Sequence, residues 1–190
     1  QQTPDFMIMK SLDNTEDWAV YTTVIDGSYD YLYLNLTGAK SDSGITPPTN
    51  SIFYRGSADA NGENIIAYLW HNVPGLQKFG TYTANNSANG PYIDLGFRPA
   101  IVITRSATQG QPWNIFDTAR SSTNPTNRGL QLDNANAEYN STERIDILSN
   151  GFKVRAGGGT EPNVGTNTYI YMAWAEAPSI NLYGAQSNAR

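Results

Sequence analysis

The chain carries an internal duplication, and this duplication constrains its fold more than any other feature. Matched blocks occur in the same order in both halves. They pair Pro4–Trp18 with Pro99–Trp113, Leu32–Asn35 with Leu130–Asp133, and Ile65–Trp70 with Tyr169–Trp174. The offset between partners grows along the chain, so the length differences fall between the blocks, where loops absorb insertions. Such a long repeat exceeds the ~20–50-residue units of solenoid proteins, so we expect two related domains in tandem.

The matched blocks have the pattern of β-strands. In the second half, strands are predicted at Phe79–Thr83, Tyr92–Phe97, Ala100–Arg105, Trp113–Asp117, Leu130–Asp133, Arg144–Leu148, Phe152–Arg155 and Tyr169–Glu176. The Asn150-Gly151 pair between two of these runs is a strong hairpin signal. No window has a convincing helical period, and the best helical candidate, Asn134–Tyr139, would form a single turn. The predicted fold class is therefore all-β, an antiparallel β-sandwich of short strands.

We expect a first unit at residues 1–77 and a second unit at residues 78–190. Strands of the first unit are predicted at Phe6–Lys10, Trp18–Tyr21, Tyr31–Leu36, Ile52–Arg55 and Glu63–Trp70. This unit has no counterpart of Phe79–Phe97, so we expect it to lack its opening strands and the chain to be part of a longer protein. An edge left open in this way invites pairing with another strand. Either another chain covers that edge, or the two units share one larger sandwich.

The composition excludes several classes of function. Charged residues make up 15% of the chain, against about 25% in ordinary globular proteins, and the net charge is −5. Without a basic block, binding to nucleic acid or to an anionic membrane surface is not expected. Membrane insertion is not expected either, because the chain has no apolar stretch of about 20 residues. The absence of cysteine excludes disulfides, thiolate catalysis and zinc–thiolate sites.

Several blocks together resemble a tandem module of tailed-bacteriophage virion proteins. These blocks are Asp5–Lys10, Glu16–Tyr21, Lys78–Thr83, Gly96–Ala100, Ile147–Arg155, Tyr169–Glu176 and Asn181–Arg190. The module lies toward the C-terminal end of tail fibre and other virion structural proteins, and the resemblance covers almost the whole chain. It implies a jelly roll of the concanavalin or laminin-G type that is exposed on a virion and used in host attachment. Its motifs are structural, and it carries over no catalytic residue.

The expected function is therefore that of a non-enzymatic virion structural protein, the distal part of a tail fibre or spike. It would bind a bacterial surface polysaccharide or another receptor, on the extracellular surface of the particle, after assembly in the host cytoplasm. Because fibres are commonly trimeric, we expect a homo-oligomer, in the first instance a trimer, in contact with other virion proteins. One alternative is capsid decoration or tail assembly without a receptor role. Another is a spike that degrades polysaccharide.

A row of tyrosines is the first candidate for ligand binding. Tyr29, Tyr31 and Tyr33 alternate along a predicted strand and so share one face, while Leu32 and Leu34 take the other face. An exposed tyrosine row favours an interface with protein or sugar. The alternative is that a second sheet or a neighbouring subunit covers this row.

Tryptophans and asparagines supply the other candidates. The tryptophans occur at matched positions in both halves, which favours a core role, and Trp18 and Trp113 are also candidates for stacking on sugar rings. The side-chain amides of Asn85, Asn86 and Asn89 could bind sugar hydroxyls, although a solvated loop would have the same composition. If the chain has receptor specificity, we expect it to lie in such unmatched loops.

No catalytic group is predicted. His71, the single histidine, lies at a predicted strand end without an identifiable partner for general-base catalysis. The acidic residues considered as a glycosidase pair are Glu16, Asp17, Asp94, Asp117, Asp133, Glu143 and Asp146. A solvated turn explains Glu16-Asp17 better than a catalytic role. No cofactor or metal is expected, except that the oxygen-rich loop Asp59–Glu63 could hold calcium.

Overall fold

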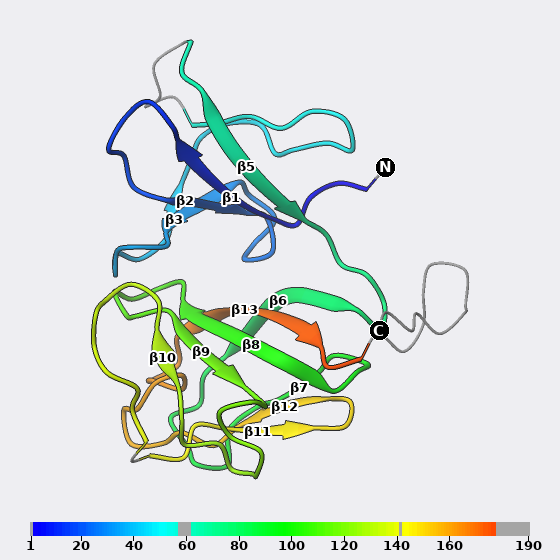
Figure 1. Cartoon of the computed structure of the whole chain (residues 1–190), viewed down its shortest axis with the longest axis vertical. Helices are drawn as coiled ribbons and strands as arrows, with labels where there is room; N and C mark the ends of the chain where they lie inside the picture. The colour runs from blue at the N-terminus through cyan, green and yellow to red at the C-terminus, as the bar shows by residue number, and fades with distance from the viewer. Residues whose placement is uncertain (1, 57–61, 141, 178–190) are drawn as a thin grey trace.

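The computed structural model describes residues 2–56, 62–140 and 142–177, and its strands form three antiparallel sheets stacked as layers (Figure 1). The outer sheet has the order β4-β3-β2-β1-β5, the central sheet β10-β9-β8-β13-β6, and the small sheet β11-β12-β7. All of the described elements are strands, which confirms the predicted all-β class. No helix in the described ranges has the length and apolar character needed to cross a membrane.

Every strand except β4 falls at a predicted block, although β7 and β10 are shorter than predicted. The outer sheet consists of β1 (Phe6–Ser11), β2 (Ala19–Thr22), β3 (Asp30–Tyr33), β4 (Ser41–Asp42) and β5 (Ile65–Trp70). The central sheet consists of β6 (Gln77–Thr83), β8 (Pro99–Ser106), β9 (Asn114–Asp117), β10 (Leu130–Gln131) and β13 (Thr168–Ala175). The small sheet consists of β7 (Tyr92–Asp94), β11 (Ile145–Leu148) and β12 (Gly151–Val154).

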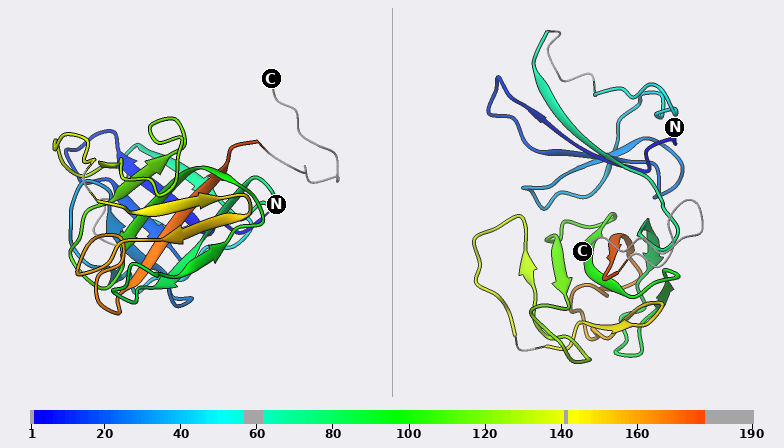
Figure 2. Two further views of the ribbon diagram at one scale, coloured as in Figure 1. Left: turned by 90° about the horizontal axis from the view of Figure 1, so that it is seen from below. Right: turned by 45° about the vertical axis from the view of Figure 1, so that its right-hand side comes forward.

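The central sheet is apolar on both faces because it packs against a sheet on each side (Figure 2). Along β13, Tyr171 and Ala173 pack toward the small sheet, whereas Ile170 and Met172 pack toward the outer sheet. A strand buried on both faces has a nearly continuous apolar sequence, as β13 does. The outer sheet contributes Phe6 and other buried side chains to the second of these cores, so both halves of the chain share one core.

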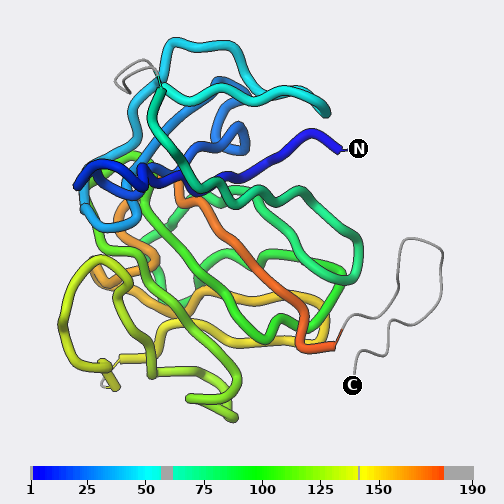
Figure 3. Tube along the Cα trace, turned by 45° about the horizontal axis from the view of Figure 1, so that its top comes forward, coloured from blue at the N-terminus to red at the C-terminus, as the bar shows by residue number. Residues whose placement is uncertain are grey.

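A long connection, rather than a sheet, covers the far face of the outer sheet. Met7 and Met9 are buried on this face, and Ile45 packs against them from the segment that follows β4. This segment lies over the outer sheet at the top of Figure 3, in cyan. The strand predicted at Ile52–Arg55 is therefore wrong, because this stretch is not a strand.

Two further local predictions are tested by the structure. The hairpin between β11 and β12 is confirmed, but Leu148 pairs with Gly151, so the turn lies one residue earlier than the Asn-Gly pair. Gly151 is needed for another reason: a Cβ there would collide with the carbonyl oxygen of Ile93 on β7. The helical turn predicted at Asn134–Tyr139 is wrong, because Tyr139 instead forms a β-bridge with Gly129.

Candidate ligand-binding site

The far face of the outer sheet contains a hollow of about 330 Å³ whose floor is aromatic. Tyr21, Tyr31 and Tyr33 line it, with Met9 and Ala19 beside them. The rim carries the charged residues Glu16, Asp17, Asp42 and Arg55. We call this feature the tyrosine hollow. It combines a floor of aromatic rings with polar groups at the edge, as small-molecule sites commonly do.

Strand pairing places the tyrosines together. In the antiparallel pair β2–β3, Tyr21 lies opposite Tyr31 and Ala19 lies opposite Tyr33. Residues two apart on a strand point to the same face, so the small Ala19 leaves the space above it open to Tyr33. The ring centres of Tyr21 and Tyr31 are 6.0 Å apart, and those of Tyr31 and Tyr33 are 5.7 Å apart with an edge-on arrangement. The row predicted from the sequence is thus present at Tyr31 and Tyr33, and Tyr21 extends it onto the next strand.

Tyr29 is a correction to the predicted row, because its side chain is only 1% exposed. Its ring stacks on Tyr21 at 5.0 Å, and its hydroxyl donates a hydrogen bond to the backbone carbonyl of Tyr54 at 3.0 Å. Desolvation raises the pKa of Tyr29, as expected for a phenol inside the protein. Tyr29 therefore packs beside Tyr21 inside the protein and is not placed to touch a ligand.

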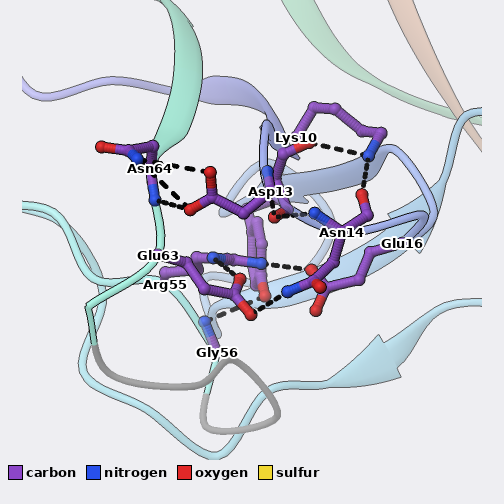
Figure 4. Close-up of polar contacts among 10 residues, drawn as sticks. Lys10, Asp13, Asn14, Glu16, Arg55, Gly56, Glu63 and Asn64 are labelled. Carbon is purple, nitrogen blue, oxygen red and sulfur yellow. Dashed lines mark hydrogen bonds and ion pairs between the residues drawn. The ribbon is translucent and has the colours of Figure 1, made fainter.

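One wall of the hollow is built around Arg55 (Figure 4). Its guanidinium pairs with Glu63 at 3.0 Å and with Glu16. The next residue, Gly56, donates its backbone N–H to the Tyr21 hydroxyl at 3.0 Å, and a Cβ at this position would collide with that hydroxyl. The wall therefore holds the phenol of Tyr21 in place.

The turn before β2, which carries the acidic rim, is also fixed by hydrogen bonds. Asp13 accepts a bond from the backbone N–H of Asn64 at 2.7 Å, and the backbone and side-chain N–H groups of Asn64 hold the pKa of Asp13 below its usual value. Asp17 accepts a bond from the amide of Asn35 at 2.7 Å, and Asn35 accepts one from the backbone N–H of Trp18 at 2.9 Å. The rim carboxylates of Glu16 and Asp17 thus lie on an anchored segment, whereas that of Asp42 lies on β4.

The two tryptophan candidates lie elsewhere. Trp18 is 38% exposed just before β2 and is not among the residues that line the hollow. Trp113 is fully buried, so its predicted role in sugar stacking is wrong. Its indole Nε1 instead donates a hydrogen bond to the backbone carbonyl of Tyr33 at 2.8 Å. Trp113 is therefore a positioning residue, which fixes the end of the strand that carries Tyr33.

Arg105 assists Trp113 at the same junction. Its side chain is completely buried between the outer and central sheets, and its guanidinium lies 5.6 Å from the centre of the Trp113 ring. It donates hydrogen bonds to the backbone carbonyls of Leu36 and Gly38, which follow β3. Arg105 was not among the site residues predicted from the sequence. A basic residue inside a mostly apolar strand was the one signal that could have indicated it.

The asparagine loop does not join the hollow. The side chains of Asn85, Asn86 and Asn89 are exposed, yet each side-chain oxygen accepts a hydrogen bond within the protein. Asn163, which is buried, donates to Asn85, to Ser87 and to Ala156. These bonds tie the loop to the segment after β12. The loop amides are therefore less free to bind sugar hydroxyls than the sequence suggested. The tyrosine, tryptophan and asparagine candidates together do not form one surface.

The described residues contain no group of three or more potential metal ligands. The calcium candidate at Asp59–Glu63 lies mostly outside the described residues, since 57–61 are not described, and Glu63 is paired with Arg55. His71 lines a separate hollow beside the end of β5, together with Leu69 and Trp70.

A buried carboxyl group that the sequence did not indicate lies in the second half of the chain. Glu161 accepts a hydrogen bond from the Tyr169 hydroxyl at 2.8 Å. Burial raises the pKa of Glu161 to about 7, although this hydrogen bond and the guanidinium groups of Arg105 and Arg144 oppose the shift. Arg144 also donates to the Glu161 backbone carbonyl. These contacts join the loop after β12 to the central sheet.

Comparison with known proteins identifies the family but not an activity. The sequence profile of a family described as a domain of unknown function, DUF7483, matches residues 1–178, and the chain belongs to this family. The match spans all three sheets, from β1 to β13. A search of curated proteins and a search of solved structures each found no match.

Proposed function

We propose that this DUF7483 protein is a non-enzymatic virion structural protein, the distal part of a phage tail fibre or spike, and that it binds a glycan of the host surface in the tyrosine hollow. The virion context rests on the resemblance of its sequence blocks. The observation that supports glycan binding is the floor formed by Tyr21, Tyr31 and Tyr33.

The floor suits a sugar ring for physical reasons. A phenol offers an apolar face for the C–H groups of a pyranose and a hydroxyl for hydrogen bonding, and it loses little conformational entropy when it is held by neighbours. The Tyr21 hydroxyl is already fixed by Gly56, and the Tyr33 backbone is fixed by Trp113. At about 330 Å³, the hollow is near the lower end of the size range of ligand pockets, so it fits a short segment of polysaccharide.

The charges of the rim favour a neutral or amino-sugar segment over an acidic one. Asp17 and Asp42 line the hollow, and the positive charge of Arg55 is offset by its ion pairs with Glu16 and Glu63. An anionic polysaccharide would meet this acidic rim and the net charge of −5. Glu16 and Asp17 both accept hydrogen bonds inside the protein, which favours a positioning role over proton transfer.

We also propose that the outer and central sheets derive from the two units of the sequence duplication, each related to a jelly roll, with the boundary at residues 77 and 78. The order β3-β2-β1-β5 in the outer sheet corresponds to β10-β9-β8-β13 in the central sheet. On a particle with several copies, weak binding at each hollow would be multiplied by multivalency.

A glycan array followed by titration tests this function. Tyr31→Ala should weaken binding to the best neutral glycan by about 3- to 10-fold, which is the usual contribution of one stacked aromatic ring. The matched control is Tyr92→Ala on the small sheet, since Tyr92 is 46% exposed and does not line the hollow. Loss of binding in both variants, or in neither, would contradict the proposal.

The position of the protein in the particle is a separate test. Antibody labelling of virions should mark the distal end of the tail. Labelling over the capsid lattice would instead support the capsid-decoration alternative.

A further inference from the structure

β5 forms one edge of the outer sheet. It pairs with β1 along its whole length, from Trp70 opposite Phe6 to Ile65 opposite Ser11. In the described ranges, no strand lies on the other side of β5. An edge strand presents a row of backbone N–H and C=O groups that can pair with an added strand.

The sequence of β5 lacks the features that usually protect an edge. Its six residues, Ile65–Trp70, are all apolar or aromatic, without charge or proline. The other edge strands of the three sheets are very short or carry a charged residue. They are β4 with Asp42, β6 with Lys78, β7 with Asp94, β10 with two residues, and β11 with Asp146. Among the described edges, β5 is therefore the one best suited to strand addition.

Apolar side chains are exposed on and beside this edge. Tyr68 and Leu69 of β5 are 44% and 41% exposed. Leu69 also lines a hollow of about 300 Å³ together with Ile52 and Phe53, which are 53% and 37% exposed. Leu69, Ile52 and Phe53 thus form an exposed apolar patch on one face of this edge, as interaction sites commonly do. The occupant should therefore be extended and apolar.

The central sheet shows what fits beside such a strand. There, β13 pairs with β8 on one side and with β6 on the other, from Thr83 opposite Thr168 to Gln77 opposite Trp174. β5 has the same position relative to β1 that β13 has relative to β8. The protein thus already contains an antiparallel strand at the equivalent edge of its central sheet.

We propose that a second copy of this chain occupies the edge, by antiparallel pairing of β5 with its counterpart across a two-fold axis. An antiparallel pair of identical strands is self-complementary, so the contact closes at two chains and not at the trimer expected from the fibre resemblance. With the axis at Tyr68, each Tyr68 would lie opposite its counterpart, and Ala67 of each copy would lie opposite Leu69 of the other, so that paired side chains share a face. No like charges would meet, because β5 has none, and the exposed Tyr68 and Leu69 would become covered.

This arrangement would join the two outer sheets into one continuous sheet. A two-fold axis perpendicular to a sheet leaves the same face of both copies on the same side. Both tyrosine hollows would then open in one direction, which would make the dimer bivalent if the proposed glycan binding holds. The dimer itself does not depend on glycan binding, so the two proposals can fail separately.

Light scattering after size-exclusion chromatography tests the dimer. The wild-type chain should have twice the mass of the 20.8 kDa protomer, with dissociation on dilution. Leu69→Lys places like charges at the contact and should give a monomer. The matched control, Leu132→Lys, changes a leucine that is 40% exposed outside β5 and should remain a dimer. Tyr68→Glu, on the opposite face of β5, serves as the second variant, and circular dichroism checks that each variant is folded.

Hydrogen exchange gives a second readout on the same samples. The β5 amides that point away from β1 should be protected in the wild-type protein and unprotected in Leu69→Lys. A wild-type monomer at the highest soluble concentration, a trimer, or a dimer that both β5 variants leave intact would overturn the proposal.

Discussion

The outer and central sheets share a strand order, yet one is a buried layer and the other carries a candidate binding surface. The difference lies in what covers them. The small sheet packs on the far side of the central sheet, whereas the connection after β4 covers the far side of the outer sheet and leaves the tyrosine hollow. The same arrangement of strands is thus covered by a sheet in one place and open at a hollow in the other.

Individual positions show how the sequence produces this difference. Tyr21 in the outer sheet corresponds to Phe116 in the central sheet, each at the same distance after its matched tryptophan. Phe116 is fully buried and packs edge-on against Tyr139, whereas Tyr21 presents its hydroxyl to the wall of the hollow. Tyr31 corresponds to Gly129, where a Cβ would collide with the Tyr139 hydroxyl. In the central sheet, a loop side chain therefore fills the space that is open in the outer sheet.

The largest effect on stability is expected when the matched tryptophans are replaced. Trp113→Ala should lower the free energy of unfolding by about 3–5 kcal/mol, because it removes a fully buried ring and the hydrogen bond to Tyr33. Trp18→Ala should cost far less, because Trp18 is 38% exposed. Urea denaturation of both variants measures the difference. Equal losses would show that the two positions have the same role, contrary to this comparison.

Glu161 and two aspartates of the first half of the chain, Asp13 and Asp26, should contribute to stability with opposite pH dependence. The folded-state pKa of Glu161 is raised from 4.5 to about 7, so its stabilising contribution is full below pH 4.5 and is lost as the pH rises through 7. A shift of this size corresponds to at most about 3 kcal/mol. In the first half of the chain, hydrogen bonds lower the pKa of Asp13 and, mainly through Lys40, that of Asp26. Their contribution is present above their unfolded pKa of 3.8 and is lost as the pH falls below it.

Thermal unfolding between pH 4.5 and 8 measures the effect of Glu161. Glu161→Gln should flatten the decline of stability toward pH 8, because glutamine does not ionise. The control is Glu138→Gln, at a carboxylate that is partly exposed on the surface. An unchanged pH profile in Glu161→Gln would show that Glu161 does not cause the decline.

Much of the strand pattern was predictable from local sequence. Alternation placed Tyr31 and Tyr33 on one face, and the hairpin before Gly151 followed from turn chemistry. What covers each face was not predictable, because it depends on contacts between residues far apart in the chain. Tyr29 lies under Tyr54, and no periodicity in either segment signals that contact.

The matched tryptophans show the same limit. Trp18 and Trp113 have the same spacing from a proline, but only Trp113 lies between two sheets. Repetition in the sequence indicates equivalent strands, whereas burial depends on the layers that the rest of the chain adds. For the same reason, the sequence did not show which parts of the chain Arg105 and Glu161 contact.

The central claim is that the outer sheet binds glycan in the tyrosine hollow, and an NMR titration with the best neutral glycan from the array tests it most directly. The account predicts that amide shifts concentrate at Ala19–Thr22 and Asp30–Tyr33, the strands that carry the floor. Shifts confined to the loop of Asn85–Asn89, or no saturable shifts for any glycan, would contradict it.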